Sequence, residues 1–278
     1  MSDTATEMPV EAPVDLVFDV QNVTLRFGGV VSLRDVSIHM NRGEILAVIG
    51  PNGAGKTSLF NSLTGVYEPQ EGHISFTDRN SRTISVIGKK TYRIARAGVS
   101  RTFQASRVFS ALTVFENVKI GAEDHGGIGL VGAIVRGPAT RRGEHLSDQL
   151  ALELLDFVGL RREANLIASA LSYGGRRRLE IARAIATDPD VILLDEPAAG
   201  TNPSEKLQLA ALIRRVRDER HVSVLLIEHD MKLVMSLAER IYVLNFGGVL
   251  AEGTPAEIRA NQAVVEAYLG TTTDEGTS

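Results

Sequence analysis

The segment 50–57 has residue types and spacing that bind the phosphates of a nucleotide. It reads Gly-Pro-Asn-Gly-Ala-Gly-Lys-Thr, which fits the P-loop pattern G-x-x-x-x-G-K-[ST]. Glycines let backbone N–H groups approach phosphate oxygens, and the helix that follows adds its positive dipole end. Lys56 would reach the β- and γ-phosphates, and the Thr57 hydroxyl would ligate Mg²⁺. The predicted nucleotide-binding residues here are Gly50, Pro51, Asn52, Gly53, Ala54, Gly55, Lys56, Thr57 and Ser58.

Two adjacent carboxylates end an apolar run further along the chain. The run 191–194 reads Val-Ile-Leu-Leu and leads directly into Asp195 and Glu196. Because an apolar strand cannot keep charges inside, these acids are expected at the carboxyl edge of a sheet. There Asp195 would support Mg²⁺, directly or through water, and Glu196 would polarise an attacking water as general base.

A third segment has the features of an anion site at the start of a helix. Ser172 and Gly174 stand in Leu-Ser-Tyr-Gly-Gly, just before the arginine-rich stretch 176–183. Alone, a serine followed by small residues is more typical of an ordinary helix cap. Its position shortly before the acidic strand favours a role in contacting phosphate.

Alternating strands and helices would position these three segments. Continuous aliphatic runs suit buried parallel strands at 45–49, 191–194 and 222–227. Shorter strands are expected at 16–20, 23–27, 241–244 and 249–251. From 92 to about 186 the pattern is mainly helical, which indicates a helical subdomain inserted into an α/β core. The ends, 1–15 and 271–278, are expected to be flexible tails.

The composition is that of an ordinary packed protein of 278 residues. Hydrophobic residues make up 44% and charged residues 23%, which excludes a wholly disordered chain. A net charge of −4 gives no strongly basic surface, so no nucleic-acid partner is expected. The absence of cysteine excludes disulfides and thiolate catalysis. No apolar run approaches the ~18 residues of a membrane helix, and no signal peptide is recognised, so we expect a cytoplasmic protein.

The order of these motifs resembles that of the ATP-binding cassette (ABC) ATPases. In that family a P-loop is followed by a Leu-Ser-x-Gly signature and then by an apolar strand ending in Asp-Glu. The gap of 139 residues from Lys56 to Asp195 fits an inserted helical subdomain better than a small P-loop kinase or GTPase. The resemblance covers nearly all of 16–270. It implies an α/β P-loop NTPase core with an N-terminal antiparallel β-subdomain and an inserted α-helical subdomain at about 92–186.

The resemblance assigns roles to further residues. Gln104, in Arg-Thr-Phe-Gln, is similar to the Q-loop glutamine, which in the family touches Mg²⁺ or the water and senses the membrane partner. His229 resembles the switch histidine that contacts the γ-phosphate. Phe27 resembles the aromatic residue that stacks on adenine. Ser172 and Gly174 would approach the γ-phosphate of an ATP held by the other subunit of a head-to-tail dimer.

A narrower resemblance is to the LivG-type ATP-binding subunits of branched-chain (hydrophobic) amino-acid importers. It rests on Asp-Glu-Pro-Ala-Ala-Gly at 195–200, Glu-His-Asp-Met at 228–231 and Ala-Tyr-Leu-Gly at 267–270. It implies ATP and Mg²⁺ as cofactors, a second ATP-binding subunit in a homo- or heterodimer, membrane permease subunits, and indirectly a periplasmic or extracellular substrate-binding protein. The chain would be peripheral on the inner face of the cell membrane.

This sequence departs from the family pattern at three positions. Gly175 stands where signatures usually have Gln, Thr201 where the subgroup usually has Leu, and Asn202 where many members have Asp. Ser172 and Gly174 remain, so we still expect a functioning site.

Other functions stay open. One is an ABC ATPase of another transport system, such as urea or amide import or lipopolysaccharide export. A soluble ABC ATPase acting on DNA or ribosomes is disfavoured, because the chain has neither a long coiled-coil insertion nor a second cassette. A small-molecule P-loop kinase is disfavoured by the signature segment, Gln104 and His229.

Overall fold

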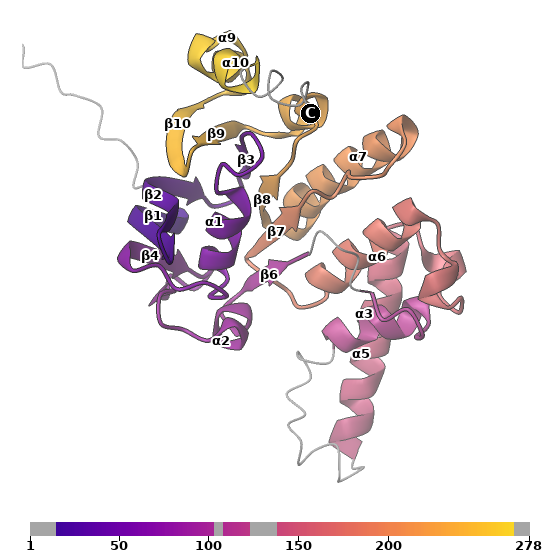
Figure 1. Cartoon of the computed structure of the whole chain (residues 1–278). Helices are drawn as coiled ribbons and strands as arrows, with labels where there is room; N and C mark the ends of the chain where they lie inside the picture. Colours follow the sequence, from indigo (N-terminus) through magenta and orange to yellow (C-terminus); the bar gives the residue numbers. More distant parts are fainter. Residues whose placement is uncertain (1–14, 103–107, 123–137, 270–278) are drawn as a thin grey trace, which may run out of the picture.

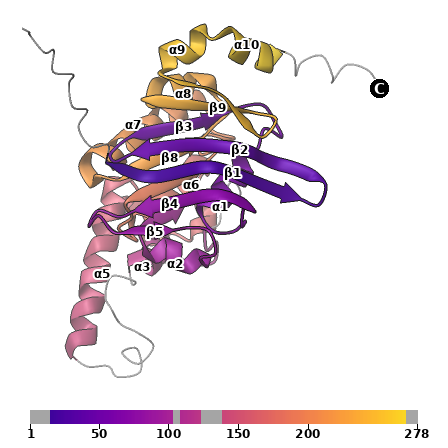
Figure 2. The ribbon, with the colours of Figure 1, turned by 90° about the vertical axis from the view of Figure 1, so that its left-hand side faces the viewer.

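Two β-sheets form the framework of the computed structural model, which describes residues 15–102, 108–122 and 138–269 (Figure 1). The smaller sheet is antiparallel, with strand order β2-β1-β4-β5. Its strands lie side by side across the front of Figure 2. They are β1 (Leu16–Phe27), β2 (Val30–Asn41), β4 (Glu71–Thr77) and β5 (Thr83–Ser85).

The larger sheet has the order β10-β9-β3-β8-β7-β6. It is parallel except for the edge strand β10, which pairs antiparallel with β9. Every residue of β3, β7 and β8 is buried, which explains why these strands are continuous aliphatic runs in the sequence. The strands are β3 (Ile45–Ile49), β6 (Val99–Arg101), β7 (Val191–Asp195), β8 (Ser223–Ile227), β9 (Arg240–Asn245) and β10 (Gly248–Gly253).

Helices cover both faces of this sheet. Successive side chains of a strand point to opposite faces, so β3 contributes to two cores. Val48 packs in the same core as Leu59 of α1 (Lys56–Leu63), together with the antiparallel sheet. Ala47 packs in the other core with Leu179 of α6 (Tyr173–Ile185). The helix after the P-loop and the helix after the signature segment therefore lie on opposite faces of the sheet.

The second core is largely helical. α3 (Val114–Ala122), α5 (Pro138–Phe157) and α6 pack together on the side of the molecule away from the antiparallel sheet (Figure 1). Two 3₁₀ turns, Arg161–Glu163 and Ala168–Ala170, connect α5 to α6. The remaining helices are α2 (Thr91–Arg96), α7 (Pro203–Arg220), α8 (Met231–Leu237), α9 (Pro255–Ala260) and α10 (Gln262–Leu269).

The predicted fold class is confirmed, and the structure refines two details. The strands expected at 16–20 and 23–27 form one strand, β1, whose register shifts where Asn22 adopts a φ of 50°. β6 lies inside the interval 92–186, where the sequence indicates mainly helices, and pairs with β7 in the larger sheet. The predicted tails lie almost wholly outside the described residues. No helix in the described ranges is long and apolar enough to cross a membrane.

Candidate nucleotide-binding site

The P-loop connects β3 to α1, and two of its glycines are required by close backbone contacts. Gly50 has a φ of 150°, and a Cβ added there would lie 2.1 Å from the carbonyl oxygen of Leu244. Gly55 has a φ of 104°, and its Cβ would lie 2.7 Å from the carbonyl oxygen of Ser32. Any other residue would have to push the backbone of β9 or β2 away. The loop conformation therefore depends on these two residue types.

Lys56 is the first residue of α1 and folds over the loop that precedes it. Its Nζ donates to the carbonyl oxygens of Gly50 at 2.7 Å and Pro51 at 2.9 Å. Burial lowers the pKa of Lys56, while the charges of Glu196 and Asp195 act in the opposite direction. The two carboxylates therefore favour the charged ammonium, the form that binds phosphate.

The outer side of the P-loop is tied to the antiparallel sheet and to the β9–β10 turn. The hydroxyls of Ser58 and Ser32 are hydrogen bonded at 2.7 Å. The backbone N–H of Gly247 donates to the carbonyl oxygen of Ala54 at 3.2 Å. Ser58 therefore uses its side chain inside the protein, which is a structural role that the sequence pattern does not show.

Asp195 and Glu196 stand at the carboxyl end of β7, as predicted. The side chain of Glu196 is 23% exposed. Its backbone adopts a φ of 45°, a left-handed conformation that is uncommon for this residue type. The N–H of Glu196 donates to the carbonyl oxygen of Ile227 at 2.9 Å, which fixes the turn to the end of β8. Strain of this kind is concentrated at functional sites.

His229 follows β8 and lies beside Glu196. Its Nδ1 is 4.0 Å from Oε2 of Glu196 and 3.9 Å from Oε2 of Glu228. Its side chain is 64% exposed, so the ring is open to solvent. Both distances exceed hydrogen-bond length. The imidazole ring is therefore near both carboxylates without being hydrogen bonded to either.

Glu228 holds this loop in shape, a role that the sequence pattern does not show. Its carboxylate is fully buried and accepts the backbone N–H groups of Ala198 at 2.7 Å, His229 at 3.1 Å and Asp230 at 3.3 Å. Burial raises the pKa of Glu228, and these three bonds act against that rise. One side chain thus joins the segment after Glu196 to the segment that carries His229.

The residues predicted for Mg²⁺ suit an ion that arrives with a nucleotide. Thr57 is exposed on the first turn of α1, and Asp195 is buried at the end of β7. In the described part of the chain no group of three or more His, Asp or Glu residues could hold a metal by itself. Mg²⁺ usually takes one or two protein oxygens and completes its shell with phosphates and water. The donor set therefore fits a magnesium–nucleotide complex.

Phe27 ends β1 with its side chain 46% exposed. Its ring meets the ring of Tyr67 edge to face, with centroids 4.9 Å apart and planes at 74°. An exposed, buttressed aromatic ring suits stacking on a base. Tyr67 carried no signal in the sequence, because the contact joins segments that are distant along the chain.

The signature residues are not brought to the P-loop of the same chain. The Ser172 hydroxyl caps α6 by accepting the N–H of Gly175 at 3.1 Å. A Cβ added to Gly174 would lie 2.6 Å from Oε1 of Glu205 on α7. Both residues belong to the face of the sheet opposite α1. Gln104 lies outside the described residues.

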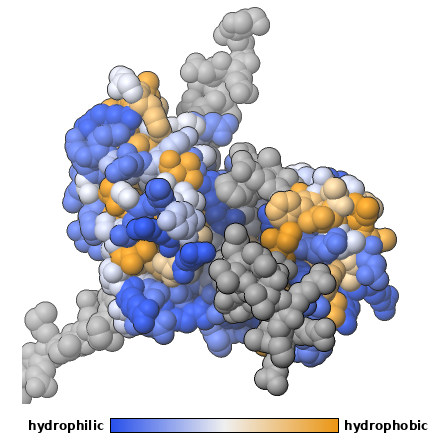
Figure 3. Space-filling model, turned by 90° about the horizontal axis from the view of Figure 1, so that it is seen from below, coloured by the Kyte–Doolittle hydropathy of each residue, from blue (hydrophilic) through white to orange (hydrophobic). Residues whose placement is uncertain are grey.

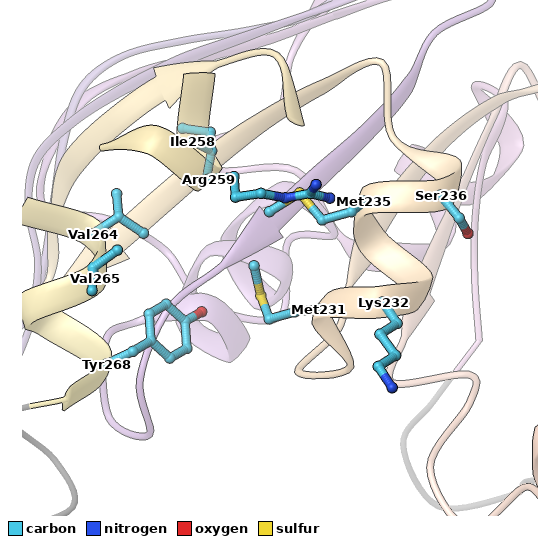
Figure 4. Close-up of a pocket in the computed structure, with 9 residues that line it drawn as sticks. All are labelled: Met231, Lys232, Met235, Ser236, Ile258, Arg259, Val264, Val265 and Tyr268. Carbon is cyan, nitrogen blue, oxygen red and sulfur yellow. The ribbon is translucent and has the colours of Figure 1, made fainter. Parts of the chain in front are cut away.

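The C-terminal helix, α10, carries a tyrosine that lies near the first residue of the P-loop. A groove of about 660 Å³ lies between α8, α9 and α10. Figure 4 shows Met231 and Tyr268 turned toward its interior. Burial raises the pKa of Tyr268, and the backbone of Gly50 acts against that rise. The last helix is thus connected to the first residue of the P-loop, a contact that the sequence does not reveal.

The P-loop helix and the capped signature helix lie on opposite faces of the larger sheet, and the Asp-Glu pair ends its strand β7. This arrangement defines an ATP-binding cassette. The ABC transporter family model matches residues 33–199, and the chain belongs to this family of ATPases. A second model, for branched-chain amino acid ATP-binding cassette transporters, matches residues 249–273.

One curated relative is the high-affinity branched-chain amino acid transport ATP-binding protein LivG of Salmonella typhimurium. It is 46% identical over 251 residues, which cover 90% of this chain and 96% of the relative. The chain is thus a member of the LivG group within the ABC family.

Solved structures agree with the fold. An ATP-binding cassette of an ABC transporter in its ADP conformation is 29% identical, with a TM-score of 0.77 over 92% of this chain and 99% of its own. A dimeric cassette in a post-hydrolysis state with ADP and phosphate is 26% identical, with a TM-score of 0.68 over 86% of this chain and 98% of its own.

Proposed function

We propose that this ATPase drives an importer of branched-chain or related amino acids. The observation that carries the proposal is the site itself, where Lys56 folds over the P-loop and His229 lies beside Glu196 at the end of β7. The substrate class is supported by the LivG relative and by the family match at residues 249–273.

Each residue of the site has a distinct task in this proposal. Lys56 and the backbone N–H groups of the P-loop bind the phosphates and stabilise negative charge in the transition state. Glu196 accepts a proton from the attacking water as general base. His229 faces the same space from β8 and orients the terminal phosphate. Thr57 and Asp195 would hold Mg²⁺, with Gln104 as a further ligand. When bound, the ion supplies positive charge to the phosphate oxygens.

A second ATP-binding subunit completes the site. Ser172 and Gly174 lie on the face opposite α1, so one chain does not place them over its own P-loop. A head-to-tail partner would bring its signature helix to this P-loop and receive the same in return. The dimeric cassette structure shows that a relative assembles as a dimer.

The helical side of the molecule is the surface proposed to meet the permease. Figure 3 shows an apolar area on this side. Membrane-protein partners suit such a surface, because large exposed apolar patches mark interaction sites. The chain would thereby be held at the cytoplasmic face of the membrane, with a substrate-binding protein on the other side. Exposed apolar residues of this region are Phe109, Ile120, Leu146, Leu166 and Ile167.

Transport in proteoliposomes tests the proposal. The chain is reconstituted with the permease subunits and the second ATP-binding subunit of its transport system. The substrate-binding protein is added outside, and uptake of labelled leucine is measured with ATP inside. We expect leucine uptake that a Lys56→Ala variant abolishes. ATP-dependent uptake of urea in place of leucine would reject the substrate class, and the absence of ATP hydrolysis would reject the function.

A further inference from the structure

A buried arginine holds one of the two acidic residues of the site. Nη2 of Arg101, the last residue of β6, lies 2.8 Å from Oδ2 of Asp195. The side chains are 8% and 6% exposed, so solvent screens this pair little. β6 is paired in parallel with β7, which places the two residues at the same edge of the sheet.

The same guanidinium reaches the helix that follows the P-loop. Its Nη1 donates to Oδ1 of Asn61 at 2.6 Å and to the Thr64 hydroxyl at 3.4 Å. Its carbon centre lies 5.6 Å from the centre of the Phe60 ring. Arg101 therefore links three parts of the nucleotide site: the acidic end of β7, the helix α1, and the segment that leads into residue 104.

The charge of Arg101 has a physical consequence for Asp195. A buried carboxylate without a counter-charge strongly destabilises the folded protein, so removal of one member of a buried pair is costly. Arg101 supplies that counter-charge from within the protein. Mg²⁺ is a second cation suited to the same carboxylate. Two cations that neutralise one carboxylate oppose each other, because each reduces the stabilisation that the other gains.

We propose that Arg101 is a positioning residue that competes with Mg²⁺ for the carboxylate of Asp195. Its hydrogen bond to Asn61 couples this competition to α1. The inference rests on the proposed binding of a magnesium–nucleotide complex. Arg101 sets the magnesium concentration at which the site loads, and it keeps the carboxylate aligned and neutralised before loading.

Thermal melting with a non-hydrolysable ATP analogue at varied free Mg²⁺ tests this directly. Arg101→Met keeps most of the apolar stem and removes the charge. Without Mg²⁺ this variant is expected to melt below the wild-type protein. With the analogue present, its half-maximal magnesium concentration is expected to fall about fivefold or more, the lower range of typical coupling between two ligands. Arg101→Gln gives the same comparison if Arg101→Met does not fold.

Three control variants separate this role from simple destabilisation. Arg79 pairs at 2.6 Å with Asp190, which lies just before the opposite end of β7; Asp190 is 6% exposed, as buried as Asp195, whereas Arg79 is 46% exposed. Arg79→Met should lower the melting temperature without changing the half-maximal magnesium concentration. Arg101→Lys, which keeps the charge, should give a magnesium response near that of the wild type. The double variant Arg101→Met with Asp195→Asn removes both charges. Without Mg²⁺, its melting temperature should be higher than that of Arg101→Met alone.

An Arg101→Met variant with an unchanged or raised half-maximal magnesium concentration would overturn the inference. A wild-type protein that does not bind the analogue with Mg²⁺ would instead overturn the proposed function. Equal loss of melting temperature at all magnesium concentrations would show that Arg101 only stabilises the fold.

Discussion

His229 Nδ1 lies 4.0 Å from Oε2 of Glu196, although the two residues follow different strands. The contact arises because β7 and β8 are paired in parallel, with Asp195 opposite Ile227. The residues that follow the two strands therefore leave the sheet at the same edge. Glu228 fixes the spacing by accepting the N–H groups of Ala198 and His229. Glu196, the proposed general base, and His229 thus lie together at this edge of the sheet.

Lys56→Ala is expected to lose most nucleotide affinity. The Lys56 ammonium is the side-chain cation of the P-loop. Burial removes part of its hydration and lowers its pKa, so the ammonium is suited to bind phosphate. We expect at least tenfold weaker binding, about 1.4 kcal/mol, measured by equilibrium binding of a fluorescent ATP analogue. Lys232→Ala, on α8 at the groove between α8, α9 and α10, removes a lysine outside the P-loop and should bind normally.

Asp230→Asn should lower stability at neutral pH and not in acid. Asp230 caps α8, and its hydrogen bond with Lys206 holds its pKa below the ordinary value of 3.8. A carboxylate whose pKa is lowered by folding stabilises the folded protein at pH values above its ordinary pKa. This stabilisation is lost as the pH falls through the lowered, folded-state pKa. Asparagine keeps the cap. Urea unfolding at pH 7 should show a less stable variant. A difference that does not shrink below pH 3.8 would contradict this account.

Asn202→Ala should destabilise α7 by about 1 kcal/mol. The Asn202 side chain accepts the N–H of Glu205 at 2.9 Å, and Glu205 returns a bond to the Asn202 N–H at 3.0 Å. This capping box explains why asparagine is well suited at a position where many family members have aspartate. Thr254→Ala removes the matching box of α9 and should cost a similar amount. Chemical denaturation measures both, and no loss in either variant would refute the capping argument.

Tyr268→Phe should weaken the attachment of α10 to the P-loop. The side chain is largely buried, which raises its pKa, and the backbone of Gly50 acts against that rise. Loss of the hydroxyl is expected to cost about 1 kcal/mol of unfolding free energy and to raise hydrogen exchange at Gly50. Tyr92→Phe, whose side chain is 52% exposed, should change neither quantity. Unaltered exchange at Gly50 in Tyr268→Phe would show that the contact does not support the loop.

The sequence alone is sufficient to predict the place of residues that belong to a local sequence pattern. The P-loop, Asp195 and Glu196 come directly after long aliphatic runs, and buried parallel strands place the residues at their carboxyl ends along one edge of the sheet. The ABC class and its α/β fold could therefore be predicted.

Contacts between distant segments could not be predicted in this way. β6 has only three residues, which is too short to show a period, so the sequence pattern assigns no role to Arg101. Its partners Asn61 and Asp195 come from elements far apart in the chain, as does Tyr67 beside Phe27. A single sequence carries no signal for such pairs.

Glu196→Gln gives the most direct test of the central claim, that Glu196 is the general base of an ATPase. Glutamine has nearly the same shape and cannot accept the proton, so ATP binding should persist while steady-state hydrolysis falls by about 10²–10⁴-fold. Size-exclusion chromatography with ATP should show an accumulated dimer, because we expect two subunits that share bound ATP to separate only after hydrolysis. A Glu196→Gln protein that hydrolyses ATP at the wild-type rate would contradict the assignment.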